Sequence, residues 1–315
     1  MNTVYARHIW WLILAMAALA VASFALTGLH IDPFSKPALL APFGLLAAIW
    51  WFYRNVRPDP RLRTLAECFA QILLLLLFGT LLSYAAAAAP IPFRDDALLA
   101  IDTALGFDRR AYIDFFDSRP WLFNTLTLSY FTFMPQFVVV LLVLFFAKQP
   151  SRMQQFVFAA GLALLVTDAI SVLTPSITTI YLDLGLPVGA EIPAYRYTPL
   201  PTLQALRSGS PYWIDLDAIE GLISFPSFHT VGAVLFIWGL WHVRYVRWFA
   251  LALNLALIAA TPMTGAHYFI DIAGGLFVAL GTIVAAVWLG RPARVPHLAV
   301  SAHAAISAAP MEPAA

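Results

Sequence analysis

The chain has 315 residues, of which 61% are hydrophobic and 11% are charged, with 18 basic residues against 17 acidic ones. Soluble globular domains carry about 25% charged residues, so this composition predicts an integral membrane protein. The near-neutral charge provides no basic face for nucleic acid, which we exclude as a partner. The single cysteine, Cys68, lies in an apolar run, so no intrachain disulfide is expected.

Long apolar runs predict an all-α fold with about eight transmembrane helices. The first run follows a short basic lead and the pair Trp10 and Trp11. Its length of roughly 20 residues favours a retained helix over a cleaved signal peptide. The expected spans are residues 9–29, 38–53, 65–89, 122–147, 153–174, 224–241, 246–263 and 267–289.

Basic residues follow every second span, in "RNVRPDPRLR", "KQPSR", "HVRYVR" and "RPAR". If the spans alternate in direction, all four segments lie on one side, which the positive-inside rule makes cytoplasmic. The long loops 90–121 and 175–223 then lie on the outer side. The alanine-rich composition and short cytoplasmic loops favour a bacterial inner membrane, with these loops in the periplasm.

Three segments are expected. Residues 1–64 form two N-terminal helices and a basic loop, residues 65–290 form a six-helix core, and the Ala- and Pro-rich residues 291–315 form a disordered cytoplasmic tail. Within the outer loop, residues 94–118 alternate acidic and apolar side chains at helical spacing. This pattern predicts an amphipathic helix that either packs on the bundle as a solvated loop helix or covers a lipid site as a lid.

Polar side chains interrupt two of the spans. Around Pro135 they form a kinked stripe, which predicts hydrogen bonding between helices or, alternatively, a headgroup pocket. Asp168 is an acid inside the fifth span, where we expect it to pair with an arginine or to bond Thr167 and neighbouring helices. The stripe consists of Ser129, Tyr130, Thr132 and Gln136.

His229 and His267 begin the sixth and eighth spans. One helix inward and one helix back return both imidazoles to the same outer membrane face. Asp271, four residues after His267, can accept a hydrogen bond from its ring, and this fixes the tautomer and raises the basicity. A histidine held in this way can attack phosphorus, while the second histidine protonates the leaving group.

Ser227 precedes this sixth helix and is expected to be its N-cap rather than a catalytic residue. The free backbone N–H groups of such a helix start also favour a bound phosphate. The pair Gly274 and Gly275 most simply permits close helix packing.

The segments "FPSFHT" and "HYFID" together resemble the second and third signature motifs of the type 2 phosphatidic acid phosphatase superfamily, whose members cleave or transfer lipid phosphoryl groups. Phe228 stands where the common second motif has glycine, and Ala260 and Thr261 occupy the Ser-Arg positions of the third. The inositol phosphorylceramide synthase, or aureobasidin-resistance, branch shares these departures. The chain resembles that branch most closely, over residues 65 to 289.

The resemblance implies that His267 is the nucleophile, Asp271 its partner and His229 the general acid. It implies a phosphohistidine intermediate without metal or cofactor, a phospholipid donor and a lipid or alcohol acceptor. The first motif of the superfamily, Lys, six residues and Arg-Pro, is absent. Only Arg196 and Arg207 in the second outer loop are then left to clamp a phosphate, and we favour Arg207. The alternative is that either arginine anchors to lipid headgroups.

Four other interpretations remain open. The enzyme could be a lipid phosphate phosphatase acting on phosphatidic acid or a polyprenyl or lipid pyrophosphate, because water can also resolve a phosphohistidine. A proton-coupled lipid transporter would require inverted repeats and broken helices, which the sequence does not indicate. A serine protease using Ser227 and His267 lacks the glycine-flanked serine. A metal bound by two histidines and a carboxylate is chemically plausible.

Overall fold

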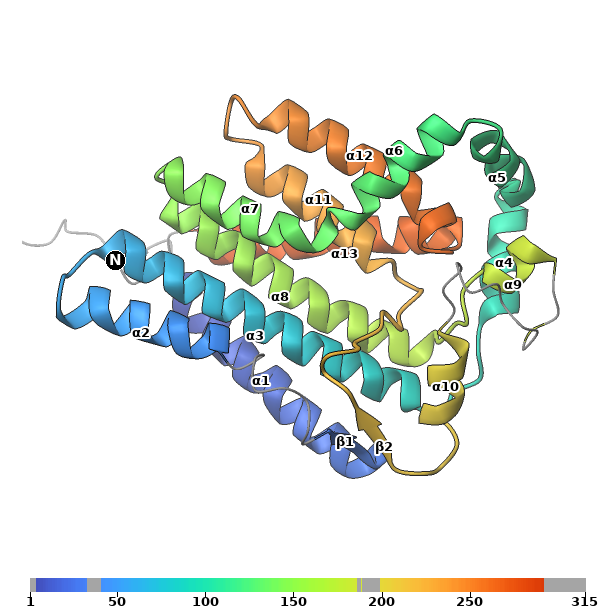
Figure 1. Cartoon of the computed structure of the whole chain (residues 1–315), viewed down its shortest axis with the longest axis horizontal. Helices are drawn as coiled ribbons and strands as arrows, with labels where there is room; N and C mark the ends of the chain where they lie inside the picture. The colour runs from blue at the N-terminus through green and yellow to red at the C-terminus, as the bar shows by residue number, and fades with distance from the viewer. Residues whose placement is uncertain (1–3, 33–40, 186–187, 189–198, 292–315) are drawn as a thin grey trace, which may run out of the picture.

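The computed structural model describes residues 4–32, 41–185, 188 and 199–291, and these residues form a helical bundle (Figure 1). The predicted all-α membrane class is thereby confirmed. Strands β1 (Leu29–Ile31) and β2 (Tyr212–Ile214) form a small parallel sheet. The helices are α1 (Val4–Thr27), α2 (Ala41–Asn55), α3 (Pro60–Ala88), α4 (Asp95–Ala104), α5 (Arg109–Asp117), α6 (Pro120–Phe131), α7 (Phe133–Phe146), α8 (Pro150–Leu173), α9 (Ile180–Leu184), α10 (Leu200–Leu206), α11 (Phe228–Leu240), α12 (Arg247–Thr264) and α13 (Phe269–Leu289).

Each of the eight expected spans coincides with a helix or a helix pair. Among the described residues, α1, α3, α8 and α13 are long and apolar enough to cross a membrane, and a fifth span results if α6 and α7 count as one. The helices α2, α11 and α12 fall short of this criterion. The sixth span is shorter than expected, because residues 224–227 are not helical and α11 begins only after its cap at Ser227.

The fourth span is bent by 59° between α6 and α7, at Thr132. Pro135 lies in the first turn of α7, where its ring excludes a regular bond to the carbonyl of Phe131, the last residue of α6. Gln136 accepts a hydrogen bond from Asn254 of α12 at 2.8 Å, which is an interhelical bond of the predicted kind. Within the described residues this is the only broken pair, whereas an inverted-repeat transporter would have two in corresponding positions.

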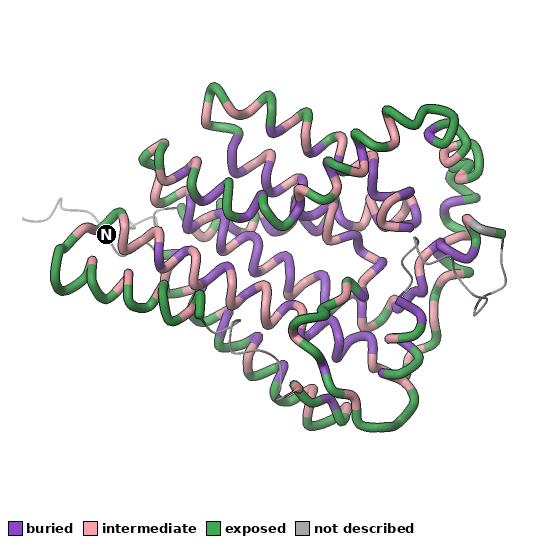
Figure 2. The backbone as a smooth tube through the Cα atoms, viewed as in Figure 1, coloured by how far each residue is buried: buried purple, intermediate pink, exposed green. Residues whose placement is uncertain are grey.

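Helices α3 and α8 form the centre of the bundle, and α1, α11 and α13 pack against them. Buried residues occur along the length of these helices, whereas the peripheral helix α2 contains no buried residue (Figure 2). The close approach of α3 and α8 depends on a glycine, since a Cβ on Gly79 would lie 2.9 Å from Leu164 of α8. Small residues at such crossings are how membrane helices gain packing contacts.

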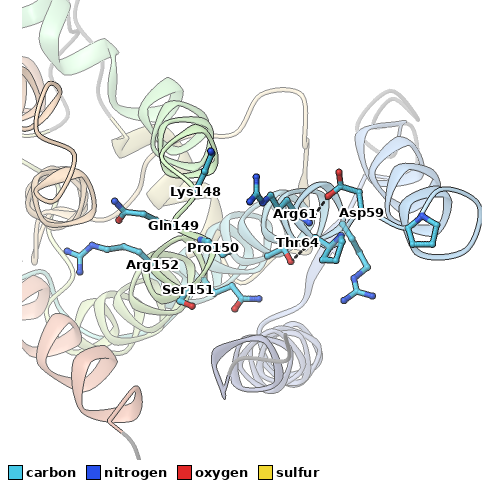
Figure 3. A pocket seen from close by; sticks show the side chains of 12 residues that line it. Asp59, Arg61, Thr64, Lys148, Gln149, Pro150, Ser151 and Arg152 are labelled. Carbon is cyan, nitrogen blue, oxygen red and sulfur yellow. Dashed lines mark hydrogen bonds between the residues drawn. The ribbon is translucent and has the colours of Figure 1, made fainter.

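The two ends of the bundle differ. Helices α4, α5, α9 and α10 gather at one end, on the right in Figure 1. At the start of α3 and α8, a cavity of about 890 Å³ is lined by Arg61, Arg63, Lys148 and Arg152 (Figure 3). These basic residues belong to the segments expected on the cytoplasmic side. The three-segment division stays a prediction, and residues 292–315 lie outside the described residues.

Candidate active site

His267 lies in the turn between α12 and α13, and its ring is held by Asp271. The distance from His267 Nδ1 to Asp271 Oδ2 is 3.0 Å, and the two side chains are 5% and 0% exposed. Their pairing was predicted from helical spacing, but His267 lies two residues before α13 begins. Asp271 is at the third position of that helix and reaches back to the turn, as carboxylates at this position commonly do.

Asp271 is itself fixed by two further hydrogen bonds. Its Oδ2 accepts from Ser224 Oγ at 2.7 Å and from the backbone N–H of Tyr268 at 3.0 Å. Asp271 Oδ2 is the acceptor in these contacts, so we assign the Nδ1–H of the His267 ring as the donor to it. With Nδ1 protonated, the lone pair of His267 Nε2 is free to act as a base or nucleophile.

His229 faces His267 from the second residue of α11. The two ring centroids are 6.4 Å apart, with an interplanar angle of 64°. Tyr130 stacks on His229 at 4.1 Å, and the Tyr130 hydroxyl lies 3.2 Å from His229 Nδ1. The Phe133 ring packs against His229 at 4.3 Å. These aromatic contacts, from the bend between α6 and α7, fix the orientation of the second imidazole.

The approach of the two histidine-bearing segments depends on glycines. A Cβ on Gly275 would lie 2.5 Å from the Ser227 carbonyl oxygen, and one on Gly274 would lie 2.8 Å from the Phe225 ring. The close-packing role predicted for this pair is therefore confirmed. Ser227 is the N-cap of α11, as predicted, and its fully buried hydroxyl accepts from Thr230 N at 3.4 Å.

Helix α4 holds the start of α13 through two carboxylates, that of the buried Asp102 and that of the half-buried Asp95. Asp102 accepts hydrogen bonds from the backbone N–H groups of Phe269 and Ile270, each at 2.8 Å. Asp95 accepts from Tyr268 Oη at 3.1 Å and from Ser176 Oγ at 2.7 Å. Burial is the main cause that raises the pKa of both carboxyls, although these hydrogen bonds act in the opposite direction.

Arg109, the first residue of α5, holds the other side of the His267 turn. Its Nη1 donates to the carbonyl oxygen of His267 at 2.6 Å, and its Nη2 donates to that of Pro262 at 2.6 Å. The same guanidinium forms a two-pronged ion pair with Asp183 of α9. The segment 94–118 is thus two helices, α4 and α5, which pack on the end of the bundle and position the His267 turn.

Arg207, which we favoured for binding phosphate, lies at the end of α10. Its Nε and Nη1 donate to the carbonyl oxygens of Ala87 at 2.8 Å and Ile91 at 3.0 Å, and its guanidinium covers the Phe93 ring. These bonds satisfy carbonyls at the end of α3, a usual place for a cation. Burial lowers the pKa of Arg207. In the described part of the chain, no hydrogen bond joins Arg207 to the histidines, and Arg196 lies outside that part.

Within the described residues, Asp168 of α8 forms neither an ion pair with an arginine nor a side-chain hydrogen bond with Thr167, and Arg196 lies outside those residues. The Oδ2 of Asp168 and the Oγ1 of Thr167 are buried and have no hydrogen-bond partner within the described residues. Both residues line a cavity that His229 also lines.

The arrangement brings together two imidazoles, with ring centroids 6.4 Å apart, that are chemically able to serve as a nucleophile and a proton carrier. His267 offers Nε2 with a carboxylate behind its ring, and His229 can donate or accept a proton across the gap. Sequence reasoning missed Asp95, Asp102 and Arg109 as parts of this site, for which the acidic and basic content of 94–118 was the signal. Tyr130 belongs to the polar stripe for which a headgroup pocket was the alternative expectation. Among the described residues, no group of three His, Cys, Asp or Glu side chains has the geometry to hold a metal ion.

In the comparison with known families, residues 96–285 match the family model of the PAP2 superfamily. That range is more than half of the chain and contains both histidines and Asp271. Comparisons with curated proteins and with solved structures gave no match.

Proposed function

The chain belongs to the PAP2 superfamily, and from that premise we propose that it is a lipid phosphotransferase of the inositol phosphorylceramide synthase type that works through a phosphohistidine. Membership alone makes it an integral membrane enzyme of the lipid phosphatase or phosphotransferase class. The observation that supports the phosphohistidine mechanism is the buried His267–Asp271 pair with His229 across from it at 6.4 Å between ring centroids.

In the first step, His267 Nε2 forms a bond to phosphorus while the bond from phosphorus to the departing lipid oxygen breaks. The charge that develops on the His267 ring is stabilised by Asp271, whose buried carboxylate already accepts a hydrogen bond from the Nδ1–H of the ring. His229 donates the proton that the departing lipid alkoxide needs. At the start of α11 the Thr230 N–H is capped by Ser227 Oγ, whereas the N–H groups of Phe228 and His229 have no intrahelical acceptor and favour the phosphate charge.

In the second step, an acceptor hydroxyl attacks phosphorus, the N–P bond breaks, and His229 takes the hydroxyl proton. A lipid or alcohol acceptor makes the enzyme a transferase, and water makes it a phosphatase. Support for the transferase branch comes from Ala260 and Thr261 in the Ser-Arg positions and from the Phe-Pro-Ser-Phe-His form of the second motif.

We place the site at the outer face of the membrane, which is the periplasmic face in a bacterial inner membrane. The support is the distribution of basic segments. The basic segments "RNVRPDPRLR", "KQPSR" and "HVRYVR" lie at the starts of α3, α8 and α12, whereas His229 and His267 lie at the end with α4 and α5.

The test is a product assay with purified protein, wild type beside His267→Ala. The proposal predicts an acceptor-dependent phospholipid product from phosphatidylinositol with ceramide, or with a diacylglycerol whose acyl chains differ from those of the donor, without free phosphate and in the presence of a chelator. Free phosphate released from phosphatidic acid by wild type alone would identify a phosphatase instead. Loss of activity in chelator would contradict the phosphohistidine scheme.

A further inference from the structure

A second cavity, of about 210 Å³, lies beside His229 and takes no part in the steps described above. It is enclosed by α3, α7, α8 and the segment that precedes α11, and His229 forms part of its wall. Two of its lining residues, Met134 and Ile219, are 59% and 42% exposed, so the cavity reaches the surface of the bundle. A molecule in this cavity would therefore lie against the proton carrier of the proposed reaction.

Three buried side-chain oxygens that line this cavity have no hydrogen-bond partner within the described residues. They are Thr167 Oγ1, Asp168 Oδ2 and Glu220 Oε2. Thr167 and Asp168 are only 1% and 5% exposed. Because an unpaired polar group in an apolar bundle is costly, these oxygens indicate a ligand that donates hydrogen bonds to them.

The remaining walls are mainly apolar, with Leu76 of α3, Leu164 of α8 and Phe228 of α11 among them. The cavity therefore combines unpaired acceptor oxygens on one part of its wall with aliphatic and aromatic side chains on the rest. This combination fits an amphiphilic ligand. Small-molecule sites combine these features, an apolar lining with a few polar groups that fix the orientation.

We propose that this cavity is the acceptor subsite, and that it takes an amphiphilic alcohol carrying a second O–H or N–H donor beside its reacting hydroxyl. This inference rests on the proposed function. The acceptor oxygen bonds to phosphorus as the bond from phosphorus to His267 Nε2 breaks, and the hydroxyl proton passes to His229. The second donor binds the oxygens of Asp168 and Thr167, and this contact orients the reacting hydroxyl toward His229.

The experiment compares two short alcohols, 1-octanol and 1,2-octanediol, which differ by one hydroxyl. Their phosphotransfer kinetics are measured in wild type, Asp168→Leu and Thr167→Val, with Gln71→Leu as the matched control. Gln71 is a buried residue of α3 whose amide has no partner within the described residues, and it does not line the cavity. Labelling of His267 by the donor is measured in parallel on each protein.

Wild type should use the diol with a KM roughly tenfold lower than that of octanol, because the diol makes an extra hydrogen bond to a buried acceptor. Asp168→Leu and Thr167→Val should bring the ratio of the two KM values close to one, and Gln71→Leu should leave the ratio as in wild type. A preference that persists in Asp168→Leu overturns the inference. A fall in the labelling of His267 by the donor that is as large as the change in the KM ratio also overturns the inference. The cavity would then hold the donor rather than the acceptor.

The same alcohols are also tested for binding to His267→Ala protein, which cannot form the intermediate. There the diol should raise the thermal unfolding temperature more than octanol does, and Asp168→Leu should abolish the difference. Absence of labelling in wild type would contradict the proposed function. Equal stabilisation by both alcohols in a protein that labels normally would contradict the acceptor subsite alone.

Discussion

Arg109 donates a hydrogen bond from Nη1 to the backbone carbonyl oxygen of His267 at 2.6 Å. A residue of α5 thereby fixes the main chain of the proposed nucleophile rather than its ring. Asp102 fixes the backbone N–H groups of Phe269 and Ile270, two and three residues after His267. The turn that carries His267 is thus held from both sides by α4 and α5, and the following predictions test this support.

Arg109→Ala should lower kcat by up to about 100-fold, because a displaced nucleophile loses its alignment with phosphorus. The neighbouring substitution Arg110→Ala is the control. Arg110 is 80% exposed and pairs with Asp114 on the surface, so its loss should change little. The measurement is kcat from steady-state kinetics on folded samples of both variants. Equal kcat values would show that Arg109 does not position His267.

Asp102→Ala should destabilise the protein by about 1–2 kcal/mol, because it leaves two N–H groups at the start of α13 without their acceptor. Asp96→Ala removes an exposed carboxylate from the same helix and should cost much less. The free energy of unfolding is measured by denaturant titration in detergent. An effect of Asp102→Ala no larger than that of Asp96→Ala would refute the capping role.

Gly275→Ala should destabilise the packing of α11 on α13 by about 1–3 kcal/mol, because the new methyl group would lie 2.5 Å from the Ser227 carbonyl oxygen. Gly281→Ala, on the same helix, has no atom within 4 Å of the added Cβ and should be neutral or stabilising. Thermal unfolding of both variants gives the comparison. Equal unfolding temperatures would show that the two helices do not need this close approach.

Cysteine labelling tests which end of the bundle faces outward. Cys68 is fully buried and can be replaced by serine, and single cysteines are then placed at two exposed positions, Thr103 of α4 and Ser151 of α8. A membrane-impermeant maleimide added to intact cells should label Thr103→Cys but not Ser151→Cys. The opposite pattern would place the histidines on the cytoplasmic side.

The histidine site could be predicted because its signals are local in sequence. The four-residue interval between His267 and Asp271 predicts their contact, although the contact arises from a helix start rather than from one helix face. The lengths of the two intervening helices predict that His229 and His267 meet. The number of residues between His267 and Asp271 and the lengths of the helices between His229 and His267 determine these contacts. Both can be read from a single sequence.

The support of the site could not be predicted in the same way. Asp102 and Phe269 are 167 residues apart, and Arg109 and His267 are 158 residues apart, so no local pattern links them. We favoured Arg207 because of its place in an outer loop. In the structure its guanidinium binds the Ala87 and Ile91 carbonyl oxygens, and a choice between arginines therefore depends on tertiary contacts.

The central claim is that His267 becomes covalently phosphorylated, and trapping the intermediate tests it most directly. Protein mixed with donor lipid that is labelled in its headgroup phosphate is quenched within milliseconds at alkaline pH, where phosphohistidine survives, and its peptides are analysed by mass spectrometry. We expect the label on His267 in wild type, none in His267→Ala, and much slower labelling in Asp271→Asn and His229→Ala. Full turnover by folded His267→Ala, or label on another residue, would contradict the account.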